Sequence, residues 1–138
     1  MSDLLLVDSS IWIEFLRRTG SRSHLQLRQL LIDNPDQVVT TEPVIMELLA
    51  GATDDRSLIQ LENLTNGLPL LPVESRIDYR EAASIHRATR RTGKTVRSMV
   101  DCLIAAVALR NDATLVHKDI IDYEVLCSAV GATAISWR

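Results

Sequence analysis

The stretch LLLVDSSIWIEFLRR, residues 4–18, decides the fold class because it joins a buried strand to a helix through an aspartate. Residues 4–7 form an apolar run that is too short for a helix and is typical of a strand inside a parallel sheet. Ser9 and Ser10 then begin a helical pattern, which ends at Thr19 and Gly20. Asp8 lies where strand and helix meet.

The rest of the chain alternates between apolar strand-like runs and helical patterns. Strands are predicted over 38–40, 114–117 and 132–136, an extended segment over 68–73, and helices over 24–32, 43–50, 54–64, 75–91, 99–110 and 122–130. The side chains predicted to point inward are Leu25, Leu27, Leu30 and Leu31 in the first of these helices and Ile77, Ala82, Ile85 and Ala88 or Thr89 in the helix over 75–91. The helix over 99–110 is apolar on nearly all sides and is expected at the centre of the fold.

This alternation predicts an α/β fold with a mainly parallel sheet of about four or five short strands and helices on both faces. At 138 residues the chain fits one domain over residues 1–138. Cys102 and Cys127 lie in apolar helical patterns and are expected as core residues. The longest apolar run, CLIAAVAL, has eight residues, far fewer than a membrane span needs. The N-terminus has no basic signal region, and we expect a cytoplasmic protein without membrane contact.

Four acidic residues lie beside or inside stretches that ought to be buried: Asp8, Glu47, Asp101 and Asp119. A lone ionised carboxylate in an apolar setting costs several kcal/mol or takes up a proton. Ligand sites in parallel sheets form beyond the carboxyl ends of the strands, where Asp8 and Asp119 both fall. We therefore predict that the four carboxylates converge on one pocket that holds Mg2+.

Each of these acids also has a structural alternative. Asp8 precedes a helix and is a natural N-cap, although Ser9 and Ser10 are available for that role and leave the aspartate spare. Glu47 suits the exposed face of a short helix. Asp101 completes a capping-box pattern that Ser98 begins. In the last segment either Asp119 or Asp122 caps the final helix, which leaves the other for the pocket.

Residues 86–97, HRATRRTGKTVR, contain five basic residues and no acidic one, although the whole chain has a net charge of −3. Such a strip is suited to holding phosphates. The alternative is a solvated helix end, because cations near a helix C-terminus interact favourably with its dipole. The candidates for contact with an RNA backbone are Arg87, Arg90, Arg91, Lys94 and Arg97.

At these residues the chain resembles the PIN-domain ribonucleases, in particular the VapC-like toxins of type II toxin–antitoxin modules. The similarity rests on four segments in order: VDSSIWIEFL, TEPVIMELLAG, VRSMVDCLIAAVAL and ATLVHKDIIDYEVL. It implies an acidic pocket of Asp8, Glu47, Asp101 and Asp119, with Asp8 and Asp101 as direct metal ligands. Ser10 and Ser98 match small hydroxyl positions that orient phosphate or carboxylates. Glu42 matches an acidic position of close relatives, but it is five residues from Glu47, so the two face about 140° apart on a regular helix.

The fourth segment departs from the family, because relatives often carry two acids as Asp-x-Asp before an aromatic residue. Here two residues separate Asp119 from Asp122, one more than in those relatives. The sequence therefore leaves open which of the two acids lies in the pocket. The resemblance implies hydrolysis of transfer or ribosomal RNA with Mg2+, for which Mn2+ substitutes. It also implies a cognate VapB-like antitoxin and homodimerisation. Leu58, Leu61 and Leu64 are candidates for an apolar contact between copies, or else for ordinary core.

Three other classes compete with this interpretation. A haloacid-dehalogenase-like phosphatase needs a second acid two residues after the first aspartate, where this chain has Ser10. A receiver domain uses a late lysine as Lys118 is placed here, but it also needs an acidic pair after the first strand, which is missing. A non-catalytic PIN scaffold that binds RNA is compatible with the fold, but the chain keeps all four acids.

Overall fold

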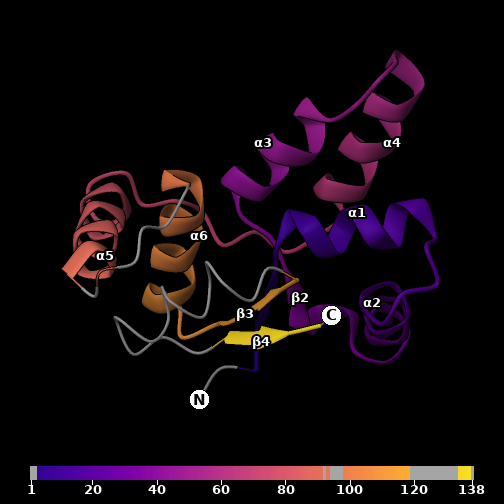
Figure 1. The fold of residues 1–138 in the computed structure, drawn as a ribbon. Helices are drawn as coiled ribbons and strands as arrows, with labels where there is room; N and C mark the ends of the chain where they lie inside the picture. The colour runs from indigo at the N-terminus through magenta and orange to yellow at the C-terminus, as the bar shows by residue number, and fades with distance from the viewer. Residues whose placement is uncertain (1–2, 92, 94–97, 119–133, 138) are drawn as a thin grey trace.

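The computed structural model describes residues 3–91, 93, 98–118 and 134–137. Figure 1 shows the arrangement of the described elements. In chain order they are β1 Leu5–Val7, α1 Ser9–Arg17, α2 Arg22–Asp33, a 3-10 turn Pro35–Gln37, β2 Val38–Val39, α3 Glu42–Ala50, α4 Asp55–Asn66, α5 Asp78–Arg91, α6 Met99–Arg110, β3 Thr114–His117 and β4 Ala134–Ser136. The predicted helix over 122–130 lies outside the described residues.

The sheet is parallel throughout, with the strand order β2-β1-β3-β4. In the registers of β1, Leu5 lies opposite both Val38 and Thr114, while Leu115 of β3 lies opposite Ala134. The predicted α/β fold with a mainly parallel sheet is therefore confirmed. Because all strands point the same way, the residues that follow them gather at one edge of the sheet.

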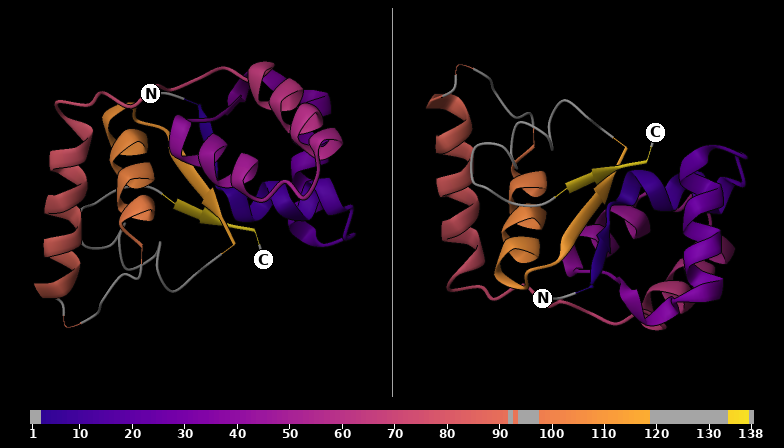
Figure 2. Two further views of the ribbon diagram at one scale, coloured as in Figure 1. Left: turned by 90° about the horizontal axis from the view of Figure 1, so that it is seen from above. Right: turned by 90° about the horizontal axis from the view of Figure 1, so that it is seen from below.

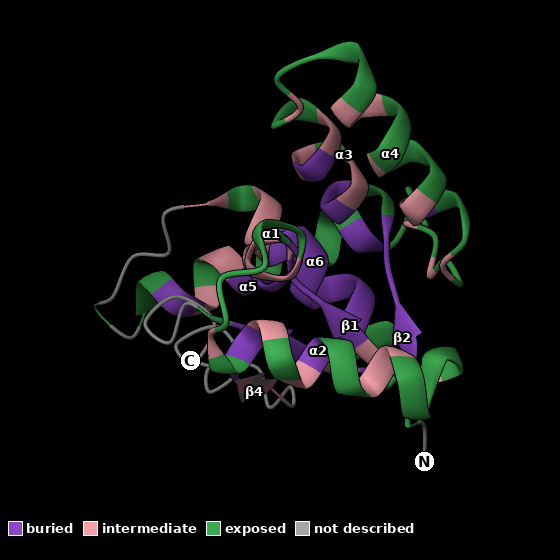
Figure 3. Cartoon of the chain, turned by 90° about the vertical axis from the view of Figure 1, so that its right-hand side faces the viewer, coloured by how far each residue is buried: buried purple, intermediate pink, exposed green. Residues whose placement is uncertain are grey.

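Helices cover both faces of this sheet, as Figure 2 shows. In both views α5 and α6 lie on one side of the strands, and α1 to α4 lie on the other. Burial is concentrated on β1, β2 and α6, whereas the outer faces of α2 and α4 are exposed (Figure 3). Residues Cys102–Ala108 of α6 are all buried, which confirms its predicted central position. No helix among the described residues is long and apolar enough to span a membrane.

Two residues predicted to point inward are exposed. Leu25 on α2 is 50% exposed, because the core-facing side of that helix is set by Ser23 and Leu27, four residues apart. Ile77 is 53% exposed, because α5 begins at Asp78 and leaves Ile77 in the preceding turn. The other predictions for α5 hold, with Ala82, Ile85 and Thr89 buried.

A buried ion pair fixes the start of α5 to the end of α6. The Asp78 side chain is 0% exposed and accepts bonds from Arg110 Nε and Nη2, both at 2.9 Å. The backbone N–H of Glu74 donates to Asp78 at 2.8 Å, and Arg110 Nη2 also donates to the Pro72 carbonyl at 2.7 Å. Burial alone raises the pKa of Asp78, but the Arg110 hydrogen bonds, the Glu74 N–H and the Arg110 charge together hold it below its ordinary value. The pair ties three segments together.

The segment over 68–73 is extended, as predicted, but it forms only a single bridge to the sheet. Thr40 donates to the Pro69 carbonyl at 3.0 Å and accepts from Leu71 N–H at 2.8 Å. Pro69 and Pro72 lack N–H groups, so this segment cannot continue as a regular strand. Next to it, Leu61 and Leu64 of α4 are partly buried against the core, which corresponds to the ordinary-core alternative for these two residues.

Candidate functional site

Asp8 leaves the sheet at the carboxyl end of β1 and is 6% exposed. Its backbone N–H donates to the Val116 carbonyl of β3 at 2.8 Å, which holds it at the edge between the two central strands. The Asp8 carboxylate caps α1, because Oδ2 accepts from Ser10 N–H at 3.1 Å and from Ser10 Oγ at 2.6 Å. The expectation that serines cap this helix and leave Asp8 spare is therefore wrong. The aspartate is the cap, and Ser10 orients it.

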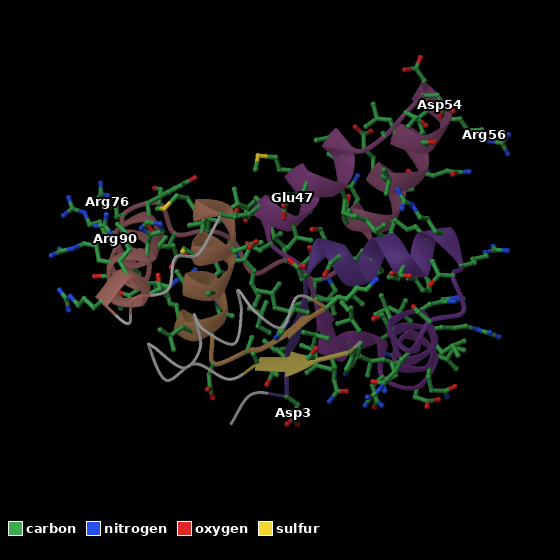
Figure 4. The ribbon with its side chains drawn as sticks, viewed as in Figure 1. Asp3, Glu47, Asp54, Arg56, Arg76 and Arg90 are labelled. Carbon is green, nitrogen blue, oxygen red and sulfur yellow. The ribbon has the colours of Figure 1, made fainter. Side chains whose placement is uncertain are left out.

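Glu47 reaches this edge from α3, which packs against α1. Its Oε1 accepts a hydrogen bond from Ser9 Oγ at 3.3 Å, and Figure 4 shows Glu47 on the side of α3 that faces α1. Burial, and then the negative charge of Asp8, raises the pKa of Glu47 above its ordinary value, while the Ser9 bond opposes the rise. The fold thus brings two carboxylates from segments 39 residues apart close enough to repel each other.

Asp101 lies in the first turn of α6 and is half-buried. Ser98 is the N-cap of that helix, and its Oγ accepts from the Asp101 backbone N–H at 3.3 Å. Because α6 packs against α3 and β3, its first turn belongs to the same region of the fold as Glu47. Ser98 therefore caps α6, as the capping-box alternative predicted, through a bond to the backbone rather than to the carboxylate of Asp101.

The fourth acid cannot be placed, because Asp119 and Asp122 lie outside the described residues. Lys118, directly before Asp119, forms an ion pair with Glu14 of α1. The hydrogen bond from Lys118, followed by one from Thr19, lowers the pKa of Glu14 to about 2. This contact ties the residue after β3 to the helix that Asp8 caps.

Glu42 is not part of this acidic group. It is exposed, and its Oε1 accepts from the backbone N–H of Val73 at 2.9 Å, so it serves to hold the segment before α5. The geometric argument from a five-residue spacing on one helix is correct here. Ser9, in contrast, was expected only as a capping residue, and its bond to Glu47 was missed. The one indication in the sequence of this role is that Ser9 directly follows Asp8.

The arrangement fits a divalent cation in its donor chemistry. Carboxylate oxygens are the ligands that Mg2+ prefers, and Mg2+ usually keeps several waters, so one or two carboxylates are enough to hold it. Burial and then the charge of Asp8 raise the pKa of Glu47, and a cation bound beside this carboxylate would offset both effects. Within the described ranges no three acidic, histidine or cysteine side chains form a metal-binding group by themselves. The predicted ligand set also includes Asp119, which lies outside these ranges.

A cleft of about 430 Å³ opens beside Glu47 between α1, α3 and α4. Its lining combines apolar side chains, Ile13, Leu16, Leu48 and Leu61 among them, with charged and polar ones: Arg17, Glu47, Thr53, Ser57 and Gln60. Ile13 and Leu16 are 40% and 43% exposed, so this apolar surface is open to solvent. The cleft therefore offers aliphatic contacts together with one cationic and one anionic side chain.

Of the predicted basic strip, Arg87, Arg90 and Arg91 are exposed on α5. Lys94 and Arg97 lie outside the described residues. Figure 4 shows Arg90 reaching outward from α5 on the side away from α6, together with Arg76, which the sequence interpretation did not include.

Asp8 follows β1 at the carboxyl edge of a parallel sheet, with Glu47 of α3 close to it, and the PIN domain family model matches residues 5–124. The chain is 46% identical over 135 residues to VapC ribonuclease Mb1587 of Mycobacterium bovis and to ribonuclease VapC11 of Mycobacterium tuberculosis, covering 98% of this chain and 100% of each relative. The chain therefore belongs to the PIN-domain family, and within it to the VapC ribonucleases.

Solved structures of more distant sequence share the fold. The chain matches VapBC from Salmonella typhimurium, solved bound to DNA, with a TM-score of 0.81 and 19% identity over 100% of both chains. It matches VapBC2 from Rickettsia felis, solved with a promoter DNA fragment, with a TM-score of 0.77 and 16% identity over 98% of this chain and 99% of that one.

Proposed function

We propose that this protein is the toxin of a type II toxin–antitoxin module and acts as a Mg2+-dependent endoribonuclease on transfer or ribosomal RNA. The observation that carries the proposal is the approach of Glu47 to Asp8 at the carboxyl edge of the sheet, where burial and then the like charge of Asp8 raise the pKa of Glu47. Relatives that are 46% identical over nearly the whole chain are named ribonucleases.

The residues take distinct roles in this proposal. Asp8 and Asp101 hold the ion, and Ser10 keeps the Asp8 carboxylate in place through its bond of 2.6 Å. Mg2+ supplies a water of lowered pKa and charge stabilisation at the scissile phosphate, and Mn2+ substitutes. Glu47 orients the attacking water and accepts its proton, a role that its raised pKa favours. Asp119 or Asp122 completes the acidic group.

The reaction is hydrolysis by in-line attack. The water oxygen forms a bond to phosphorus while the bond between phosphorus and the 3′-oxygen of the preceding nucleotide breaks. The products are a 5′-phosphate and a 3′-hydroxyl, and the proton from water is balanced by protonation of the leaving oxygen. No covalent intermediate with the protein is needed.

We also propose that a VapB-like antitoxin covers the cleft between α1, α3 and α4. Its apolar residues suit an aliphatic segment, Glu47 suits a basic side chain of the partner, and Arg17 suits an acidic one. Solved relatives with the same fold are VapBC complexes, which supports a partner of this kind. Occupation of the cleft would then exclude metal or substrate from the acidic edge.

The test is cleavage of cellular RNA by the purified protein with and without Mg2+, followed by sequencing of the new 5′-phosphate ends. Asp8→Asn and Asp101→Asn are expected to lower kcat by about a hundredfold or more, and Glu47→Gln by a similar factor, because each removes a group that acts on the metal or the water. Glu42→Gln is the matched control and should cleave normally. If the unmodified protein binds RNA but leaves it intact with Mg2+ and Mn2+, it is a non-catalytic PIN scaffold.

A further inference from the structure

The outer face of α5 carries a stripe of three arginines, Arg80, Arg87 and Arg91. At 3.6 residues per turn, Arg87 and Arg91 lie within about 20° of Arg80 around the helix axis. All three side chains are exposed, and the small residue Ser84 lies between Arg80 and Arg87 on the same face. The buried residues of α5 lie on the opposite side: Asp78, Ala82, Ile85 and Thr89. The stripe therefore faces solvent along most of the helix.

The helix dipole favours Arg91, which lies in the last turn of α5, but it does not explain the stripe as a whole. Arg80 lies in the first turn of α5, where the helix dipole disfavours a cation. Arg87 and Arg91 are four residues apart, a spacing at which like charges repel each other. The acidic residues of α5 lie off the stripe, because Asp78 is buried against Arg110 and Glu81 is about 100° around the axis from Arg80. Neither ion pair found among the described residues involves the stripe.

The stripe leads toward the acidic edge of the sheet. α5 and α6 pack side by side and are joined by a short connection between Arg91 and Ser98, so they run in opposite directions (Figures 1 and 2). The Asp78–Arg110 pair fixes the start of α5 to the end of α6. The other end of the stripe, at Arg91, is therefore beside the first turn of α6, where Asp101 is located. From Arg80 to Arg91 the helix rises about 16 Å.

We propose that this stripe is a track for the phosphodiester backbone of the RNA, in which Arg91 and Arg87 contact phosphates near the cleaved bond and Arg80 contacts phosphates farther away. The inference rests on the proposed function and adds Arg80 to the candidate RNA contacts, all of which lay within residues 86–97 in the sequence analysis. A guanidinium binds phosphate oxygens through two parallel hydrogen bonds. A span of about 16 Å is enough for several successive phosphates of one strand, which rise by ~3.4 Å each in a duplex.

Such a track reads charge and spacing rather than base sequence. Its arginines contribute to binding and do not touch the reacting phosphorus, so their loss should raise KM and leave kcat nearly unchanged. Because Arg80 is farthest from Asp101, its loss should matter for long RNA and have little effect on an oligonucleotide that reaches only Arg87 and Arg91.

The test uses two triple variants with the same change in net charge. R80S/R87S/R91S removes the stripe, and R22S/R28S/R56S removes three exposed arginines from α2 and α4; Figure 4 shows Arg56 at the opposite end of the molecule from Arg76 and Arg90. Both are made in an Asp8→Asn background and titrated with a fluorescein-labelled single-stranded RNA of mixed sequence at a series of salt concentrations. The stripe variant should bind about tenfold more weakly or worse, and its log–log salt slope should flatten by about 2 units.

The control triple should keep the affinity and the slope of its parent. R80K/R87K/R91K should keep most of the slope, because charge is retained, and lose part of the affinity, because two parallel hydrogen bonds are lost. In the cleaving background the serine triple should raise KM about tenfold and change kcat by less than about twofold.

The inference is overturned if the stripe triple and the control triple bind RNA equally, or if the stripe triple changes the mass of the protein in solution while RNA affinity stays the same, which would make α5 a protein contact. Failure of the proposed function is a separate result. A protein that binds RNA through the stripe but does not cleave it would overturn the nuclease and support the track.

Discussion

The protein buries carboxylates in two regions, and the surroundings shift the pKa in opposite directions in the two. Asp78, at the junction of α5 and α6, accepts two bonds from Arg110 and one from a backbone N–H, and its pKa is lowered. Glu47, at the edge of the sheet, has one hydroxyl partner at 3.3 Å and lies close to a second carboxylate, and its pKa is raised. The first region is compensated by protein groups, and the second has negative charge that a ligand can neutralise.

This difference indicates that the charge of Asp78 stabilises the folded chain and that the charge of Glu47 costs stability. A buried charge with full compensation is costly to disrupt, because removal of one partner leaves the other uncompensated. The raised pKa of Glu47, caused by burial and then by the charge of Asp8, means that its ionised form costs stability in the folded chain, so its neutralisation should stabilise the fold. Mutations of the same kind in the two regions should thus have effects of opposite sign.

The largest effect is expected at Asp78. Asp78→Ala should lower the free energy of unfolding by about 3 kcal/mol, because Arg110 keeps its charge and loses two hydrogen bonds. Urea unfolding of the metal-free protein measures this. Asp54→Ala is the control, since Asp54 is an exposed N-cap that bonds Ser57 N–H at 2.7 Å and should cost about 1 kcal/mol. A double change of Asp78→Leu and Arg110→Met should lower the free energy of unfolding less than Asp78→Ala alone. If Asp78→Ala, Asp54→Ala and the double change all lower it equally, the ion pair is no more important than an exposed helix cap.

Glu47→Gln should act in the opposite direction. In EDTA the variant should be more stable than the unmodified protein by up to about 1 kcal/mol, because a partly exposed repulsion has been removed. Added Mg2+ should raise the melting temperature of the unmodified protein through linkage and should raise that of the variant less. A variant that is less stable than its parent in EDTA would mean that the carboxylate pair is not a source of strain.

The pH dependence of the two changes should differ in sign as well. The folded-state pKa of Asp78 lies below its ordinary value of 3.8, so its stabilisation is present above 3.8 and is lost as the pH falls through the folded value. The folded-state pKa of Glu47 lies above 4.5, so its destabilisation is absent below 4.5 and appears as the pH rises through the folded value.

Urea unfolding of Asp78→Asn, Glu47→Gln and the unmodified protein from acidic to neutral pH separates the two effects. The deficit of Asp78→Asn should shrink below pH 3.8, and the gain of Glu47→Gln should emerge above pH 4.5. If both difference curves change over the same pH range and with the same sign, the contrast between the two regions is wrong.

The sequence predicts the fold well because its signals are local. Apolar runs such as TLVH and 99–110 are stable only in the interior of the protein. The elements that they form, β3 and α6, begin and end at the expected residues. Asp78–Arg110 was missed because the partners are 32 residues apart and meet only after α5 packs on α6. The mistake at Asp8 has a different cause, since capping and ligand roles were treated as alternatives although one carboxylate has two oxygens and can serve both.

The smallest expected effect concerns Ser9. Its hydroxyl donates to Glu47 at 3.3 Å and lowers the pKa of that carboxyl, so Ser9→Ala should raise it further. If Glu47 accepts a proton from water, the acidic limb of the kcat/KM profile should then move to higher pH by less than about one unit, the size expected for one weak hydrogen bond. Ser10→Ala is the comparison. Because Ser10 contacts Asp8, its loss should weaken the binding of Mg2+ and should not shift the acidic limb of the profile. A shift in Ser10→Ala without one in Ser9→Ala would assign the titrating group to Asp8 instead.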